Sequence, residues 1–143
     1  MGQALPSRPR SGPRSTAPAA PPARPRQGTR PLGDTYTHRL HSLQKLTDKV
    51  TLAAYGAVTD LSLGEGRCLT AVGAFAPLSV QHLAYAANVD KGQASRAAQA
   101  LVLRGLVRKQ PDPDDARGVV LSFTPEGEAL YHRLMKVIHR RNA

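Results

Sequence analysis

The sequence predicts a mainly α-helical domain with one small β-hairpin, an α+β fold class. Three observations support this prediction. Apolar residues recur at steps of three and four over most of residues 34–107 and again after residue 125, which is typical of amphipathic helices. The turn-rich stretch PDPDDAR separates two short apolar runs, which favours a hairpin. Residues 1–33 differ from the rest in composition and predict a separate tail.

The tail, residues 1–33, contains 8 of the 12 prolines, 6 of the 20 Lys and Arg residues and no acidic residue. It has too little apolar surface to offset the entropy of ordering, so we expect a disordered basic tail with polyproline II character. The folded domain should then be residues 34–143. The whole chain carries a net charge of +10, but residues 34–143 hold 14 basic and 10 acidic residues and therefore carry only +4. A moderately basic domain suits a nucleic-acid partner without requiring one.

Several classes of protein are disfavoured by what the sequence lacks. It has no run of about 18 apolar residues and no apolar signal region at its start. Cys68 is the only cysteine, so no intramolecular disulfide can form, and we expect a reducing, cytoplasmic setting. Glycine-rich phosphate loops and nucleophile-elbow motifs are missing, and the histidines are scattered. We therefore expect a protein that is not an enzyme and uses no metal or cofactor.

Two helices are predicted at the start of the domain. The first covers residues 34–58, where apolar residues at helical spacing mark one face: Leu40, Leu43, Leu46, Val50 and Leu52. The second begins near Leu61, where the same pattern involves Leu63, Cys68, Leu69, Val72 and Phe75. Three glycines, Gly64, Gly66 and Gly73, are expected to weaken this second helix, because glycine is a poor helix former. Pro77 separates it from the next element.

A helix-turn-helix is predicted next. Ser79 is a good N-cap for a short helix that runs to about Ala87. After a break at Asn88, Asp90 can cap a longer helix over residues 91–104. Gly105 then occupies the position after the helix where a left-handed residue is favoured.

The longer helix divides into two faces. Small apolar side chains share one face, where they allow close helix packing: Ala94, Ala97, Ala98 and Leu101. Polar side chains point elsewhere and gather in the first turns: Lys91, Gln93, Ser95, Arg96 and Gln99. A helix that only faces solvent more usually carries Glu and Lys pairs, so this set favours hydrogen bonding to base edges and phosphates over the alternative of an ordinary solvated face.

The hairpin and a last helix complete the domain. Residues 106–110 and 118–123 read as strands, with a Pro- and Asp-rich turn between them. Alternation in the second strand predicts a buried face made of Val119, Leu121 and Phe123. Thr124 should cap a helix that starts with Pro at its first position and runs from residue 125 toward 141. Its apolar residues step by three and four: Leu130, Leu134, Val137 and Ile138.

This order of elements is that of a winged helix-turn-helix. In such modules the helix at residues 91–104 would enter the major groove of DNA, while the wing at residues 111–118 would meet the backbone or the minor groove. Arg117 would be the cation that the wing delivers, and Asp115 could accept from its guanidinium and hold it ready. The alternative for Arg117 is a surface charge. Ser79 and Gln81 could donate to a phosphate, although capping is the simpler role for Ser79.

At this point the chain resembles the MarR family of bacterial transcriptional regulators, over roughly residues 40–138. The resemblance rests on the block LSVQHLAYAANVDKGQASRAAQALVLRGLV, the wing DPDDAR, and the spacing from Asp115 and Arg117 to Thr124-Pro125-Glu126-Gly127. It implies a homodimer built from the first and last helices, and a small-molecule effector pocket between those helices and the DNA-binding lobe. It also implies further helical residues after Ala143, so that the dimerisation region would be incomplete in these 143 residues.

The sequence thus predicts a sequence-specific regulator of double-stranded DNA, and more specifically a repressor. A second reading is a basic winged-helix module that binds RNA or a protein partner without operator specificity. A third reading makes Cys68 a redox switch, although a small buried residue on an apolar face is the plainer interpretation of this thiol.

Overall fold

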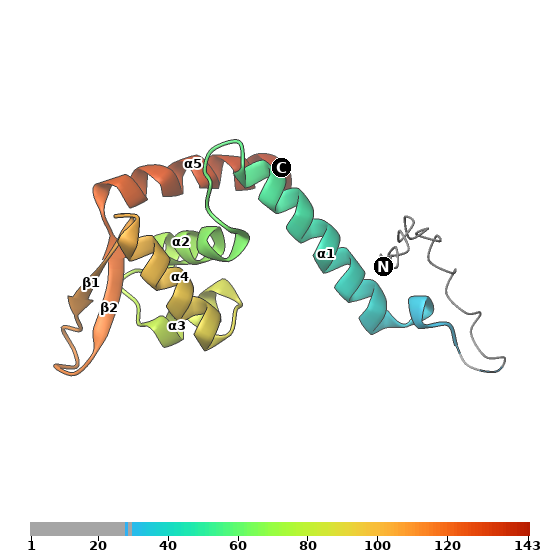
Figure 1. Ribbon diagram of the computed structural model, residues 1–143, viewed down its shortest axis with the longest axis horizontal. Helices are drawn as coiled ribbons and strands as arrows, with labels where there is room; N and C mark the ends of the chain where they lie inside the picture. The colour runs from blue at the N-terminus through green and yellow to red at the C-terminus, as the bar shows by residue number, and fades with distance from the viewer. Residues whose placement is uncertain (1–27, 29) are drawn as a thin grey trace, which may run out of the picture.

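The computed structural model describes residues 28 and 30–143 (Figure 1). In chain order its elements are η1 (Leu32–Asp34), α1 (Tyr36–Tyr55), α2 (Leu63–Phe75), α3 (Val80–Ala87), α4 (Lys91–Leu103), β1 (Val107–Pro111), β2 (Val119–Phe123) and α5 (Pro125–Asn142). The predicted mainly α fold with a small hairpin is confirmed. The prediction of a disordered tail falls on residues that lie almost entirely outside those described. The one exception is its end, where η1 begins two residues before the expected boundary.

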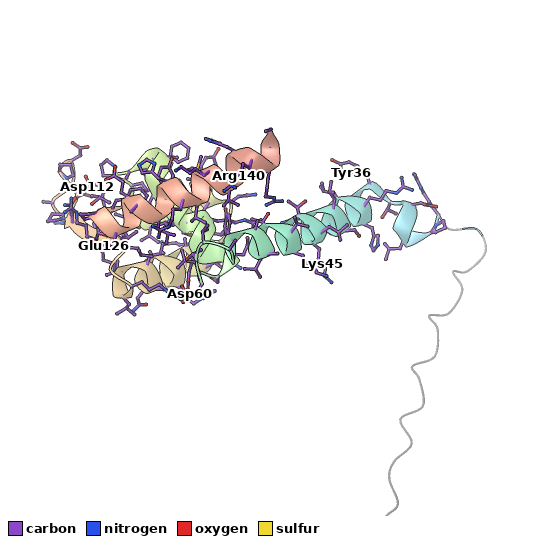
Figure 2. All side chains as sticks on the ribbon, turned by 90° about the horizontal axis from the view of Figure 1, so that it is seen from above. Tyr36, Lys45, Asp60, Asp112, Glu126 and Arg140 are labelled. Atoms are coloured by element: carbon purple, nitrogen blue, oxygen red, sulfur yellow. The ribbon has the colours of Figure 1, made fainter. Side chains whose placement is uncertain are left out.

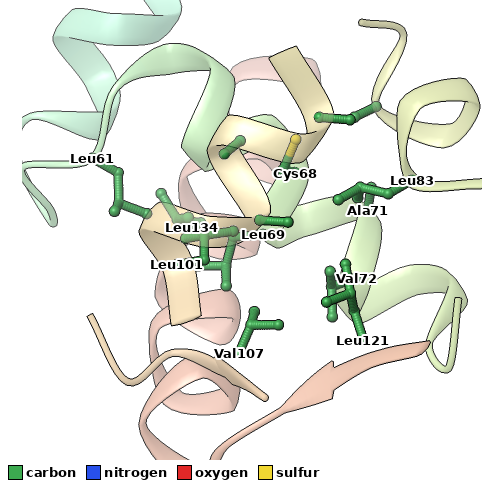
Figure 3. Packing of buried hydrophobic residues seen from close by; sticks show 14 of the residues in the cluster. Leu61, Cys68, Leu69, Ala71, Val72, Leu83, Leu101, Val107, Leu121 and Leu134 are labelled. Atoms are coloured by element: carbon green, nitrogen blue, oxygen red, sulfur yellow. The ribbon is translucent and has the colours of Figure 1, made fainter. Parts of the chain in front are cut away.

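The core lies where α2, α3 and α4 meet α5 and the hairpin (Figure 3). Its largest fully buried side chains come from every one of these elements: Leu69, Leu83, Leu101, Leu121, Leu134, Val72, Val107 and Cys68. Because the helices and the hairpin share one apolar cluster, the position of α4 is defined by contacts on several sides. Figure 1 shows α5 along one side of this body, with α3 and the tip of the hairpin on the other.

The ends of α3, α4 and α5 follow local signals, as predicted, whereas the first helix covers Tyr36–Tyr55 and not the expected residues 34–58. Ser79 and Thr124 accept backbone N–H bonds from the third residue that follows each of them, His82 and Gly127. The end of α4 is a Schellman motif, in which Leu106 N–H donates to the Leu101 carbonyl and Gly105 has a φ of 70°. These caps confirm the expected start and end of the helix-turn-helix.

The glycines of α2 have a role that propensity alone did not predict. A Cβ on Gly66 would lie 2.6 Å from the ring of Tyr55, and one on Gly73 would lie 2.4 Å from the ring of Tyr131. Glycine therefore lets one aromatic ring from α1 and one from α5 pack directly against the backbone of α2. Gly64 differs from the other two glycines, because nothing lies within 4 Å of its Cβ position. No neighbour requires glycine there, so Gly64 acts only as a poor helix former, as predicted.

The buried face of the second strand was predicted wrongly in part. Leu121 is buried as expected, but Val119 is 48% exposed and Val120 is only 6% exposed. Val119 pairs with Pro111 at the end of the hairpin that is farthest from the core, so strict alternation does not bury it. Leu121 lies nearer the core and also pairs with Leu78, exchanging two backbone hydrogen bonds of 2.8 and 3.3 Å. Leu78 thus forms an isolated β-bridge that attaches the hairpin to the start of α3.

Helix α1 extends away from the body and contacts it mainly near its C-terminal end (Figures 1 and 2). The stripe of Leu40, Leu43, Leu46 and Val50 is exposed. Leu52 was predicted on the same face, but it follows Val50 by two residues and therefore lies on another side of the helix. Within the described residues, no helix is both long and apolar enough to cross a membrane.

Candidate nucleic-acid interface

The polar residues predicted on α4 share the solvent side of this helix. Lys91, Gln93, Ser95, Arg96 and Gln99 are all exposed, whereas Ala94, Ala97, Ala98 and Leu101 are buried. The division into two faces is therefore confirmed. Because the buried side chains are mostly alanines, α4 packs closely on α2 and α3 and still presents its whole polar side outward.

Gln93 has a structural role that was not predicted. Its backbone N–H donates to Asp90 Oδ1 over 2.8 Å, and its side-chain oxygen accepts from Asp90 N–H over 3.4 Å. Together these bonds form a capping box at the start of α4. The spacing of Asp90 and Gln93 in the sequence was the available signal. The cap uses one of the two acceptor sites of the amide oxygen and leaves the NH₂ group of Gln93 free to meet a partner.

The start of α3 supports the simpler reading of Ser79. Its hydroxyl oxygen accepts the backbone N–H of His82 over 3.2 Å, so it caps the helix. Gln81 is exposed in the first turn of α3. The cap uses an acceptor site of the Ser79 hydroxyl, so its O–H could still donate to a phosphate, as could Gln81 and free backbone N–H groups.

The wing corrects the predicted pairing of Asp115 with Arg117. Asp115 Oδ1 accepts the backbone N–H of Arg117 over 3.0 Å, and Asp112 Oδ1 accepts the backbone N–H of Asp114 over 2.9 Å. Both aspartates are thus turn formers, in the manner of Asx turns. Among the residues that the structure describes, Arg117 forms no ion pair, and its side chain is exposed at the tip of the hairpin. The turn positions the backbone of Arg117 and leaves its guanidinium open to solvent.

Two further cations on the hairpin were missed by the sequence reasoning. Arg108 and Lys109 are both exposed on β1. Arg108 Nε donates to Ser122 Oγ over 3.2 Å, and this contact orients its side chain across the two strands. The doublet of basic residues just before the Pro- and Asp-rich turn was the signal that could have identified them. With Arg117 they give the hairpin three cations, equal in number to the three aspartates of its turn.

Arg104 was also missed, because its partners are distant in sequence. It lies at the C-terminal cap of α4, where one nitrogen is 2.9 Å from Asp60 Oδ1 and another is 3.7 Å from Glu65 Oε2. Glu65 belongs to the capping box that starts α2. No local pattern predicts an ion pair between residues that are 44 positions apart. The contact joins the end of α4 to the start of α2.

Cys68 is fully buried in the core (Figure 3). Burial raises the pKa of its thiol to about 11, and the nearby Glu65 carboxylate adds to the shift. The thiol is therefore protonated at neutral pH, whereas a redox sensor needs thiolate and access to solvent. The environment of Cys68 favours the packing role over the redox reading.

Comparisons with known proteins identify this arrangement. Residues 59–118, from just before α2 to the wing, match the model of the MarR family. The chain is also 25% identical over 99 residues to the multiple antibiotic resistance protein MarR of Escherichia coli K12, a match that covers 69% of this chain and 68% of that protein. The chain is similar to the MarR family over its helix-turn-helix and wing. The resemblance inferred from the helix-turn-helix block and the wing is thus confirmed.

Solved structures of MarR-family proteins share the fold. A mutant of Escherichia coli MarR, complexed with operator DNA, has a TM-score of 0.64 and 22% identity, with 71% of this chain and 72% of that chain covered. PcaV of Streptomyces coelicolor, in complex with its natural ligand, has a TM-score of 0.65 and 23% identity, with 80% and 79% covered. These likenesses confirm the winged-helix architecture, which within the described residues has five α-helices and a two-stranded wing.

Proposed function

We propose that this chain is a sequence-specific, double-stranded DNA-binding transcriptional repressor that acts as a homodimer. The observation that carries the proposal is the exposed set of hydrogen-bonding residues on α4, next to a hairpin that presents Arg108, Lys109 and Arg117 to solvent. Base edges in the major groove are recognised by such side chains, and phosphates or the narrow minor groove attract such cations. The match to the MarR family model and the similar structure complexed with operator DNA support the same proposal.

We propose different roles for the two parts of this surface. The first turns of α4 hold Lys91, Ser95 and Arg96, which would face the major groove together with Gln99 and the amide of Gln93. The wing holds Arg117, which would contact the backbone or minor groove. Gln81 would contact a phosphate at the start of α3. Because phosphate contacts carry no sequence information, α4 should determine specificity and the wing should mainly add affinity.

Selection from a random duplex library, followed by affinity measurements over a range of salt, tests the proposal. We expect enrichment of an inverted repeat with half-sites about one DNA turn apart, because a two-fold dimer presents two α4 helices at that spacing. Enrichment of no sequence, with salt-sensitive binding, would contradict the proposal and favour the alternative of a basic module for RNA or a protein partner. Repression is then measured with the enriched site placed in a promoter.

Substitution of single arginines separates the two roles. We expect Arg117→Ala to weaken binding to all duplexes alike and to lower the salt dependence by about one phosphate contact. Arg96→Ala should instead cost about 1–3 kcal/mol on the enriched site and relax the preference at particular base pairs. Lys136→Ala, which removes a cation from α5 on the other side of the body, is the control. Equal effects of all three changes would show that only overall charge matters.

A response to a small organic anion is supported by the surroundings of Arg67. Its guanidinium pairs with Asp48, and the two side chains are only about one-third exposed. The pair links α1 to α2. Arg67 lines two neighbouring cavities of about 320 and 330 Å³, one toward Met135 and Ile138 of α5 and the other toward Leu40 and Thr47 of α1. A carboxylate that entered either cavity could take the place of Asp48 on the guanidinium.

The anion proposal is tested with benzoate as the probe, by measuring release from the selected duplex and thermal stabilisation of the protein. We expect Arg67→Gln to bind DNA as the natural chain does. Benzoate should release this variant from the duplex, and stabilise it against heat, much less than it does the natural chain. Arg133→Gln, at an exposed arginine of α5, should keep the response. A response to benzoate that survives in Arg67→Gln would place the anion elsewhere. If the carboxylate is the group that is recognised, benzamide should have no effect on the natural chain.

A further inference from the structure

A single side-chain hydroxyl, that of Thr124, links the backbone after α4 to the first turn of α5. Thr124 Oγ1 donates to the Gly105 carbonyl over 2.6 Å and accepts the Gly127 N–H over 3.1 Å. The first bond reaches the residue just after the cap of α4, and the second caps α5. A hydroxyl is suited to this double role because it carries one donor and two acceptor sites.

Further contacts hold the same two segments together. The Thr124 N–H donates to the Leu106 carbonyl over 3.2 Å, and Leu106 N–H closes the Schellman motif of α4 on Leu101. Gly127 packs so closely on Leu106 that a Cβ would lie 1.8 Å from its carbonyl oxygen. The first turn of α5 therefore packs directly on residues 105 and 106. These residues lie between the end of α4 and Val107, the first residue of β1.

A change of angle at this junction would displace the far end of α4 most. With 13 residues α4 is about 20 Å long, so a tilt of a few degrees at Gly105 would move its first turn by about 1 Å. The residues that would contact base edges lie mainly at that first turn. A shift of this size is enough to lengthen or misalign hydrogen bonds.

We infer that Thr124 is a positioning residue for DNA recognition: its bond to the Gly105 carbonyl acts together with the core contacts of α4 in setting the angle of this helix relative to α5. This role is distinct from capping α5, which needs only the acceptor sites of the hydroxyl. The inference rests on the proposed function, because it assigns a task in sequence-specific binding. It concerns a residue that acts through α4 and not through a contact of its own with base edges.

Three substitutions separate capping from positioning. Thr124→Asp keeps an acceptor and is a good N-cap, but an ionised carboxylate cannot donate to the Gly105 carbonyl. Thr124→Ser keeps both functions. Thr124→Val has the shape of threonine and loses both functions. Thermal unfolding is used to choose a temperature at which each variant is folded, and to check that Asp and Ser retain the cap.

The measured quantity is the ratio of affinities for the selected duplex and for an unrelated duplex, in the full chain. A new negative charge weakens binding to every duplex and therefore changes this ratio less than it changes either affinity, and a loss of stability alone does not change the ratio for folded protein. We expect Thr124→Asp to lower the ratio of affinities by about three- to tenfold, which corresponds to the loss of one hydrogen bond between α4 and a base edge. Thr124→Ser should preserve the ratio.

Each outcome decides a definite point. An unchanged ratio in folded Thr124→Asp would overturn the inference, as would an equal loss in Thr124→Ser, which would implicate the methyl group instead. If Thr124→Asp does not fold, Thr124→Val carries the test with the same expected loss. If the natural chain binds all duplexes equally, the proposed function fails, and this result is separate from any behaviour of the variants.

Discussion

Gly127→Ala is expected to destabilise the protein by about 3 kcal/mol, the upper end of what overpacking of a close contact usually costs. The new Cβ would lie 1.8 Å from the Leu106 carbonyl oxygen and 2.8 Å from its carbonyl carbon. Backbone atoms cannot rotate away as the end of a flexible side chain can. The first turn of α5 would have to separate from the end of α4, and the Thr124 bonds would be lost with it. Urea unfolding followed by circular dichroism measures the change.

Gly64→Ala is the matched control, because it makes the same chemical change in a helix. No neighbouring atom comes within 4 Å of the Cβ position of Gly64. Its replacement should be neutral or should stabilise the protein by up to about 1 kcal/mol, through the entropy of the unfolded chain and the better helix propensity of alanine. If both variants had similar stability, the tight contact at Leu106 would not be a feature of the folded protein.

The double substitution Leu43→Glu with Leu46→Glu is expected to abolish dimer formation and to weaken binding to the two-half-site duplex by about 100-fold or more. These leucines are 60% and 62% exposed on a helix that extends from the body. A dimer needs an apolar surface of this kind, and the proposed homodimer would supply a second copy to cover it. Joining two DNA-binding units typically gains a factor of about 10²–10⁴ in affinity, so separating them should lose it.

Sedimentation and binding to duplexes with one or two half-sites measure this effect. Lys45→Glu, on another side of α1, changes the net charge by the same −2 and should leave the dimer intact. The double variant should still bind a single half-site about as the natural chain does, because α4 and the wing are untouched. A dimer that survives the double substitution would show that α1 is not the interface.

Much of the fold could be predicted because its signals are local. Ser79, Asp90, Gly105 and Thr124 begin or end helices through hydrogen bonds that span only a few residues. Such bonds depend on side-chain chemistry close by in the chain, so they can be read from the sequence. The same holds for the small apolar face of α4, where the helical period alone brings Ala94, Ala97, Ala98 and Leu101 together.

The candidate site was predictable in its location but less so in its chemistry. The polar side of α4 and the tip of the wing lie where the sequence predicts them. The partner of Asp115 was not predictable, because choosing between the guanidinium and the backbone N–H of Arg117 depends on the exact turn geometry. Arg108 and Lys109 were missed because a basic doublet on a short strand is a weak signal by itself. The pairing of Arg104 with Asp60 depends on the packing of α4 against α2.

By itself the sequence determined the order of the elements, the helix ends at Ser79, Asp90, Gly105 and Thr124, the resemblance to the MarR family and the side of α4 that meets solvent. Only the tertiary structure decided which valine of β2 is buried, why Gly66 and Gly127 must lack a side chain, and how Thr124 joins α4 to α5. The physical reason is the range of the interactions. Caps and helical periodicity act within a few residues, whereas burial and close packing depend on which distant segments meet, and that is fixed by the whole core at once.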